Sequence, residues 1–186
     1  ILVTELMAGG SLADALRPGP GGTTGGFTPR RALEVALDTA RGLAYMHARK
    51  QGAIVHRDLK PGNLMVAGSP YLPAPRLVAD AGTVKLADFG LSKSLPKADK
   101  HAGFDLDSKF RLTGETGSYR YMAPEVFRHE PYNYKVDVYS FSMIVYQLFE
   151  HVPPFAGEDP VEAARQAALF DRRPPLRALG GDGGEG

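Results

Sequence analysis

The sequence contains no cysteine. Without cysteine the chain can form neither a disulfide framework nor a thiolate zinc site. Proteins of a reducing compartment often have this composition, so we take a cytoplasmic location as the default expectation.

An excess of charge of one sign is also absent. Lysine and arginine together number 22 and the acidic residues 21, which gives a formal net charge of +1. A chain this close to neutral has no overall field that would recruit nucleic acid or an acidic membrane surface. We expect no nucleic-acid partner, and any partner must be recognised locally.

Long hydrophobic runs are missing as well. The longest uncharged apolar stretch, 138–149, falls short of the roughly 20 residues that a membrane-spanning helix needs. No secretory signal stands at the start of the sequence. We therefore expect a soluble chain with no membrane span, and 186 residues that are 43% apolar can bury a core as one domain or as a large part of one.

Several short segments show helical or strand patterns. The sequence ILVTEL (1–6) predicts a short buried strand, and SLADALR (11–17) predicts one or two helical turns. Thr28 can cap a helix that has Pro29 at its first position. Apolar residues then recur at helical spacing until Gly52 ends the pattern: Ala32, Val35, Ala36, Ala40, Leu43 and Met46.

Strand-like runs flank the loop at 56–63, with AIVH before it and LMV and TVKLAD (83–88) after it. The segment 135–151 is apolar nearly all round, which is typical of a helix inside a domain. Asp159 and Pro160 begin a last helix that ends near Arg172. Segments rich in glycine and proline, 17–27 and 67–82, are interpreted as insertions, and the glycine-rich tail 180–186 as disordered.

Three ordered motifs carry the chemical signal: HRDLKPGN at 56–63, KLADFGLSK at 85–93 and GSYRYMAPEVF at 117–127. Together they resemble the catalytic loop, magnesium loop and substrate-side segment of eukaryotic protein kinases. The resemblance covers residues 1–179. It implies an α+β, mainly α fold, the large C-terminal lobe of a protein kinase with a short hinge strand, and a small lobe that is missing.

The residue types in these motifs suit phosphoryl transfer, which requires positioning and charge neutralisation. Asp58 would orient the substrate hydroxyl and take up its proton, and Lys60 would meet the γ-phosphate of ATP. Asn63 and Asp88 supply hard oxygen ligands suited to Mg²⁺. Taken alone, each of these side chains is better interpreted as a solvated loop residue, and it is the joint pattern that favours catalysis.

Further roles are implied by the resemblance alone. His56 and Phe89 would stack, Gly90 would allow a sharp turn, and Asp137 would anchor the catalytic-loop backbone. Thr4, Glu5, Met7 and Met65 would surround adenine. Arg57 would receive a phosphate carried by Thr113 or Thr116, placed there by an upstream kinase, while Ser118 would touch the catalytic loop. Glu125 would be a partly buried carboxylate without its arginine partner.

Lys60 within RDLKPGN resembles the serine/threonine branch of the kinases. The stretch 112–150 resembles the Raf-like kinases of plants and algae, especially those of the integrin-linked type. Protein substrates are the partners that this resemblance implies.

The sequence departs from the family in lacking a G-x-G-x-x-G strand, a V-A-I-K-type lysine and its glutamate partner. Two functions therefore stay open, a serine/threonine protein kinase and a pseudokinase that acts as a binding scaffold, beside a folded fragment with no role of its own. The histidines outside the motifs show no metal-site spacing and are interpreted as surface or helix-end residues: His47, His101, His129 and His151.

Overall fold

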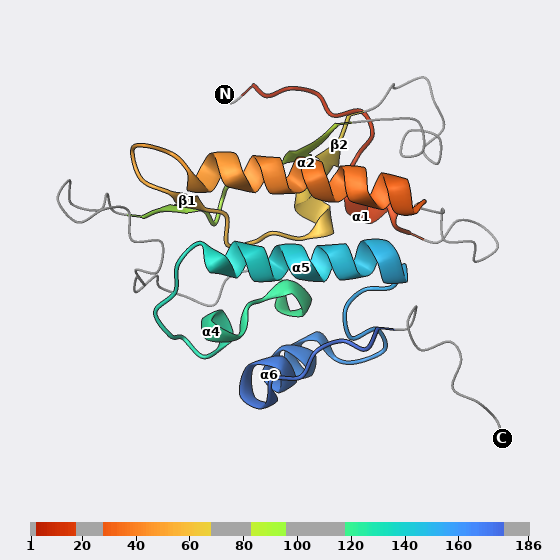
Figure 1. Ribbon diagram of the computed structural model, residues 1–186, viewed down its shortest axis with the longest axis vertical. Helices are drawn as coiled ribbons and strands as arrows, with labels where there is room; N and C mark the ends of the chain where they lie inside the picture. Colours follow the sequence, from red (N-terminus) through yellow and green to blue (C-terminus); the bar gives the residue numbers. More distant parts are fainter. Residues whose placement is uncertain (1–2, 18–27, 68–82, 96–117, 177–186) are drawn as a thin grey trace.

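The structure is a computed structural model of the chain that describes residues 3–17, 28–67, 83–95 and 118–176. Most of the two predicted insertions and the glycine-rich tail lie outside these ranges. Helices make up most of the regular structure, with two small antiparallel sheets beside them (Figure 1).

Two long helices form the centre of the molecule. Helix α2 (Pro29–His47) and helix α5 (Lys135–Glu150) lie side by side (Figure 1). On one side of this pair lie the short helix α1 (Leu12–Ala15) and a hairpin of strands β2 (Leu64–Val66) and β3 (Val84–Leu86). On the other side lie α4 (Pro124–Phe127) and α6 (Pro160–Phe170).

The predicted helix starts are confirmed. Thr28 Oγ1 accepts a hydrogen bond from the Arg31 amide, and Asp159 Oδ1 accepts from the amides of Val161 and Glu162. These side chains satisfy amide groups that have no partner within the first turn of a helix. Helix α2 ends at His47, five residues before the glycine that was expected to stop it, because a turn closed by the Gly52 amide and the Arg49 carbonyl follows first.

The predicted strand at 1–6 is wrong for the part that the structure describes. Residues 3–6 form no strand, and Val3 and Leu6 are 86% and 84% exposed. A strand needs a neighbour for its backbone groups, and pairing begins only later. The Gly9 amide donates to the Val66 carbonyl and the Val66 amide donates to the Gly10 carbonyl, which places residues 9–11 along β2.

The loop at 56–63 lies between two strand segments, as expected. Strand β1 (Ile54–Val55) precedes it and pairs with β4 (Lys93–Ser94), and the 3₁₀ helix η1 (Pro61–Asn63) leads from it into β2. The two ends of the predicted 67–82 insertion meet, because the Ala67 amide donates to the Thr83 carbonyl at 2.9 Å.

Two buried clusters form the core. The first joins α1, α2, the β2–β3 hairpin and α5: Leu12, Ala32, Val35, Leu43, Leu59, Leu64, Val66, Val84, Ile144 and Leu148. The second joins β1, α4 and the start of α5: Ala53, Val55, Leu95, Met122, Ala123, Val126, Tyr132 and Val136. Helix α5 contributes to both, but it is not enclosed all round, since Val138 is half exposed.

Candidate active site

A buried carboxylate on α5 fixes the start of the loop at 56–63. Asp137 is fully buried, and its Oδ2 accepts from the His56 amide at 2.8 Å while its Oδ1 accepts from the Arg57 amide at 2.9 Å. Arg57 has a φ of 70°, a left-handed conformation that non-glycine residues rarely adopt. The two hydrogen bonds offset this local strain and hold the loop against α5.

His47, at the C-terminal end of α2, is a third partner of Asp137. Its Nε2 lies 2.8 Å from Asp137 Oδ2, and its side chain is 13% exposed. Of the two interpretations, surface or helix-end histidine, the second is confirmed, because His47 is the last residue of α2. No local pattern could reveal the contact, because 90 positions separate the two residues.

Asp58 has its two carboxylate oxygens in different environments. Lys60 Nζ donates to Oδ2 at 2.8 Å, and Asn63 Nδ2 donates to Oδ2 at 3.0 Å and to the Asp58 carbonyl at 2.8 Å. Oδ1 is buried and accepts no hydrogen bond from the described residues. Oδ2 is thus fixed by two hydrogen bonds, whereas Oδ1 can accept a hydrogen bond from a donor outside the chain.

The β2–β3 hairpin brings Asn63 and Asp88 to the same end of the sheet. Leu64 pairs with Leu86, and the Ala87 amide donates to the Asn63 carbonyl at 2.9 Å. Because the Asn63 amide nitrogen is bonded to Asp58, its oxygen is the atom that can serve a metal ion.

Asp88 is exposed at the end of β3 and has a φ of 58°. Its Oδ1 accepts from the Gly90 amide at 3.3 Å. A carboxylate and an amide oxygen fit Mg²⁺, which usually binds one or two protein ligands and keeps waters and phosphate oxygens in its other positions. Within the described ranges there is no group of three or more His, Asp or Glu side chains that could hold a metal ion by itself.

His56 connects the loop to the Asp88 segment. Its Nε2 lies 3.0 Å from the Ala87 carbonyl, and its ring packs at 5.5 Å and a 50° tilt against Phe89. The contact between the two rings is therefore tilted. Phe89 is half exposed on its other side.

The four residues expected to surround adenine lie on the side of the molecule where the N-terminal segment meets β2. Met65 pairs with Ser11, and Glu5 forms an ion pair with Lys85 of β3 at 2.6 Å. Thr4 is exposed, and the Met7 carbonyl accepts from the Gly10 amide. The structure thus brings Glu5 and Met65 to the same hairpin.

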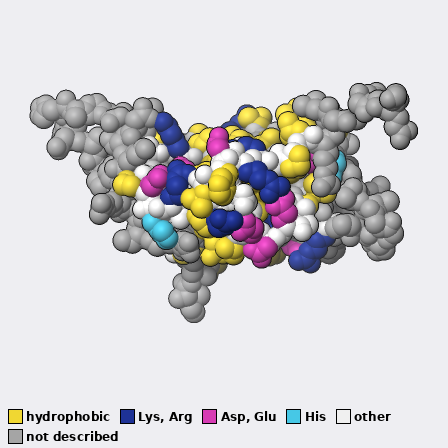
Figure 2. Space-filling model, turned by 90° about the horizontal axis from the view of Figure 1, so that it is seen from below, with side chains coloured by type: hydrophobic (Ala, Val, Ile, Leu, Met, Phe, Trp, Pro, Cys, Tyr) yellow, Lys and Arg dark blue, Asp and Glu magenta, His cyan; other side chains and the backbone are white. Residues whose placement is uncertain are grey.

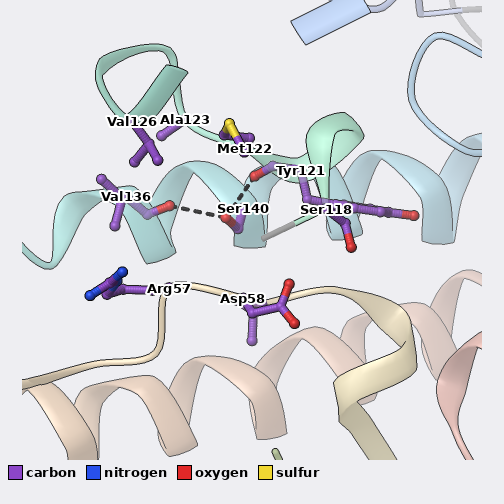
Figure 3. A pocket seen from close by; sticks show the side chains of 10 residues that line it. Arg57, Asp58, Ser118, Tyr121, Met122, Ala123, Val126, Val136 and Ser140 are labelled. Atoms are coloured by element: carbon purple, nitrogen blue, oxygen red, sulfur yellow. Dashed lines mark hydrogen bonds between the residues drawn. The ribbon is translucent and has the colours of Figure 1, made fainter. Parts of the chain in front are cut away.

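A small pocket lies between Asp58 and the 3₁₀ helix η2 (Tyr119–Tyr121). Its volume of about 10 Å³ suits one water molecule. Asp58 lies on one wall, while Ser118, Tyr121 and Met122 lie on the opposite wall (Figure 3). Ser118 therefore lies next to the loop.

The wall formed by η2 is anchored on α5. Ser140 Oγ donates to the Tyr121 carbonyl at 2.7 Å, and the Tyr121 hydroxyl donates to Gln147 Oε1 at 2.5 Å (Figure 3 shows the first of these bonds). Burial raises the pKa of Tyr121 to about 12, because the phenolate would lose its hydration there.

Glu125 lies on α4 and is partly buried, as expected. Arg128 is nearby: a hydrogen bond to Glu130 mainly raises the pKa of Arg128, and the charge of Glu125 adds to the effect. Glu125 thus has a cation in its surroundings. Thr113 and Thr116 lie outside the described residues.

The chain belongs to the protein kinase family, since a model described as the protein kinase domain matches residues 1–173. It is 43% identical over 180 residues to the serine/threonine-protein kinase VIK of Arabidopsis thaliana, a match that covers 97% of this chain and 36% of VIK. It is 37% identical to serine/threonine-protein kinase 12 of the same plant, over 96% of this chain and 33% of that kinase.

A bacterial relative is more distant. The serine/threonine-protein kinase PknB of Mycolicibacterium smegmatis is 31% identical over 95% of this chain and 24% of its own length. The resemblance to plant serine/threonine kinases is thus confirmed, and the chain spans about a third of the length of its plant relatives. No helix in the described ranges is long and apolar enough to cross a membrane.

Proposed function

We propose that this chain supplies the catalytic loop and magnesium-binding segment of a kinase that phosphorylates serine and threonine residues of proteins. The observation that carries the proposal is the buried Asp58 carboxylate, with Oδ2 fixed by Lys60 and Asn63 and Oδ1 without a hydrogen-bond partner among the described residues. The serine/threonine assignment is supported by the plant relatives, both of which are named serine/threonine-protein kinases.

Each residue of the loop has a distinct role in this proposal. Oδ1 of Asp58 accepts the hydrogen bond of the substrate hydroxyl and then its proton. Lys60 holds Oδ2 in place and presents a positive charge beside the reacting groups. Asn63 and Asp88 would hold Mg²⁺, which would neutralise the charge of the phosphoryl group that ATP supplies.

The exposed apolar surface supports the proposal that this chain is the larger lobe of the kinase domain. A groove of about 380 Å³ between α2, β1 and β3 has a mostly apolar lining: Gly42, Tyr45, Met46, Arg49, Ile54, Leu86, Phe89 and Ser92. Tyr45 is 70% exposed and Phe89 50%. Surface of this kind marks an interface, and we assign it to the smaller lobe of the domain, which would also cover Thr4, Glu5, Met7 and Met65 around adenine.

Regulation by phosphorylation remains part of the proposal. Arg57 lines the pocket beside Asp58, and a guanidinium group pairs strongly with a phosphate. Thr113 and Thr116 are the proposed sites for an upstream kinase. Mass spectrometry of the active protein should find phosphate on one of them.

Two substitutions in the complete protein test the proposed function. Asp58→Asn should lower kcat by about a hundredfold or more, the usual contribution of a positioned general base, while Mg²⁺–ATP binding persists. Asp88→Ala should weaken Mg²⁺–ATP binding itself. Calorimetry measures binding, and phosphate transfer to myelin basic protein measures turnover.

Asp171→Asn is the matched control, because it neutralises an exposed carboxylate at the end of α6. It should leave turnover and binding unchanged. If the complete wild-type protein binds Mg²⁺–ATP or a partner protein but transfers no phosphate, the scaffold function replaces the enzymatic one.

A further inference from the structure

Arg120 makes an unusual set of contacts in the segment that lines the pocket. Its NH1 donates to the carbonyls of Pro154 at 2.9 Å and Phe155 at 2.5 Å, and its NH2 donates to the carbonyl of Glu158 at 2.5 Å. All three acceptors lie in the loop that joins α5 to α6. The planar guanidinium group thus bridges η2 to a second element.

The α5–α6 loop is irregular, and among the described residues only the Phe155 carbonyl of these three also accepts from a backbone amide, that of Glu158. Phe155 and Gly157 have φ values of 53° and 86°, so the loop follows neither a helix nor a strand, and its carbonyls have no regular ladder of partners. Phe155 is 3% exposed and packs with Ala163 and Ala167 of α6. The Arg120 bonds therefore fix the loop where it is already partly held by packing.

A second arginine, located just after the end of α6, binds the same loop. Arg172 forms a bidentate pair with the Glu158 carboxylate at 2.6 and 2.7 Å, and its guanidinium lies 5.5 Å from the centre of the Phe155 ring. The loop is thus held by both Arg120 and Arg172. Arg120 also links the loop to η2.

The neighbours of Arg120 face the pocket, whereas Arg120 does not line it. Ser118, Tyr121 and Met122 lie on the pocket wall opposite Asp58 (Figure 3). Tyr121 is anchored to α5 by two hydrogen bonds, one at its carbonyl and one at its hydroxyl. The position of this wall therefore depends on two anchors, α5 through Tyr121 and the α5–α6 loop through Arg120.

We propose that Arg120 is a positioning residue for the protein substrate: it joins the 118–122 segment and the 153–158 loop into one rigid wall beside Asp58, against which the substrate polypeptide binds. This inference rests on the proposed kinase function. It concerns binding of the protein substrate and leaves the binding of nucleotide, on the Asn63 and Asp88 side, unaffected.

We do not expect the substrate to bind the charge of Arg120 directly, because the guanidinium group donates to backbone carbonyls. The α6 side of the molecule shows basic and acidic side chains next to one another, with hydrophobic side chains between them (Figure 2). Its arginines form ion pairs, Arg165 with Glu162, Arg172 with Glu158 and Arg173 with Asp171. A lysine at position 120 would keep the charge, but its three donors sit on one nitrogen, whereas the three carbonyls are bound by two separate nitrogens of the planar guanidinium group.

Steady-state kinetics of the complete kinase with myelin basic protein test the proposal. Arg120→Ala and Arg120→Lys should both raise the KM for the protein substrate about tenfold or more, as expected when a charged hydrogen-bonding group is lost. The KM for ATP should stay within about twofold of the wild-type value. Arg128→Ala is the matched control: Arg128 also donates to a carbonyl of α6, at Ala168, but it lies outside the pocket, so both KM values should persist.

Equal increases in the KM for protein and ATP, or full activity of Arg120→Lys, would overturn the proposal. Hydrogen exchange gives a readout that does not need catalysis. Amides in both 118–122 and 151–159 should exchange faster in Arg120→Lys than in wild type, and a change confined to one segment contradicts the bridge. A wild-type protein without phosphotransfer would refute the proposed function, while this exchange measurement would still decide whether the two segments are joined.

Discussion

At the scale of single residues, the buried polar groups around the pocket differ in how many of their atoms are paired. Asp137 uses both oxygens and accepts from three groups on two other elements. Asp58 uses only one oxygen within the described part of the chain. A fully paired carboxylate stabilises a loop, whereas a half-paired one is available for a reactant, and the roles that we propose for the two aspartates differ accordingly despite similar burial.

Tyr121 gives a pH-dependent prediction at this scale. Burial raises the pKa of Tyr121 to about 12, from a usual value of 10.0. Between these values the unfolded state releases the proton while the folded state keeps it. The contribution of protonated Tyr121 to the free energy of unfolding is therefore fully present below pH 10 and is lost as the pH rises towards 12.

Tyr121→Phe isolates this contribution. Below pH 10 the variant should be less stable by about 1 kcal/mol, because the hydrogen bond to Gln147 is lost. The difference in unfolding free energy should shrink as the pH rises above 10, and urea denaturation of the purified kinase domain at several pH values measures it. A difference that is constant up to pH 11.5 would show that Tyr121 does not titrate as described.

At the scale of elements, one carboxylate joins α2, α5 and the catalytic loop. His47 provides the contact from α2, so His47→Ala would remove one of the three donors to the buried Asp137. We expect kcat to fall about tenfold with little change in the KM for ATP, since a hydrogen bond to a charged group is worth roughly 1.5 to 3 kcal/mol. His47→Gln keeps a side-chain donor and should restore part of the rate.

Arg30→Gln serves as the control for His47 because it removes an exposed hydrogen bond, donated to Glu34, on the same helix. It should leave kcat unchanged. If His47→Ala lowers only the melting temperature and His47→Gln restores nothing, the contact is structural and does not position the loop.

Local sequence patterns were sufficient to predict where the helices begin. They were insufficient to predict which strands and side chains contact each other. Thr28 with Pro29 and Asp159 with Pro160 predicted two helix starts, because a cap depends on residues within one turn. Strand β4 and the His47 contact could not be predicted, because their partners lie tens of positions away. The strand expected at 1–6 failed for the same reason, since its apolar residues indicate burial but not the neighbour that would provide it.

The candidate site was predictable in its residues and not in its geometry. The spacing within HRDLKPGN named Asp58, Lys60 and Asn63, but not that Lys60 and Asn63 share one oxygen of Asp58. The bridge made by Arg120 was invisible in the sequence, because its acceptors are backbone carbonyls, which every residue carries.

At the scale of the whole molecule, the groove beside Phe89 leads to a prediction about the 186-residue chain on its own. Half-exposed Phe89, exposed Tyr45 and the exposed Val3 and Leu6 leave apolar surface facing water. Such surface promotes self-association, and nucleotide would meet an open site from which water is not excluded. Positioning contributes on the order of 7 to 11 kcal/mol to reactions of well-oriented groups, so the isolated chain should turn over negligibly.

The measurement compares purified residues 1–186 with the complete kinase domain. Phosphate transfer to myelin basic protein gives turnover, and sedimentation velocity gives the association state. Comparable turnover by the two proteins, with an inactive Asp58→Asn control, would contradict the assignment of this chain to one lobe.

The hydrogen bond between Ala67 and Thr83 bears on how well the protein tolerates insertions and deletions between these two residues. It joins the far ends of strands β2 and β3, and the register of these strands sets the distance between Asn63 and Asp88. Doubling the length of a flexible loop costs only about 0.6 kcal/mol. Evolution can therefore lengthen, shorten or replace this segment while Asn63 and Asp88 keep their places, and a protein engineer can introduce a reporter or affinity tag there.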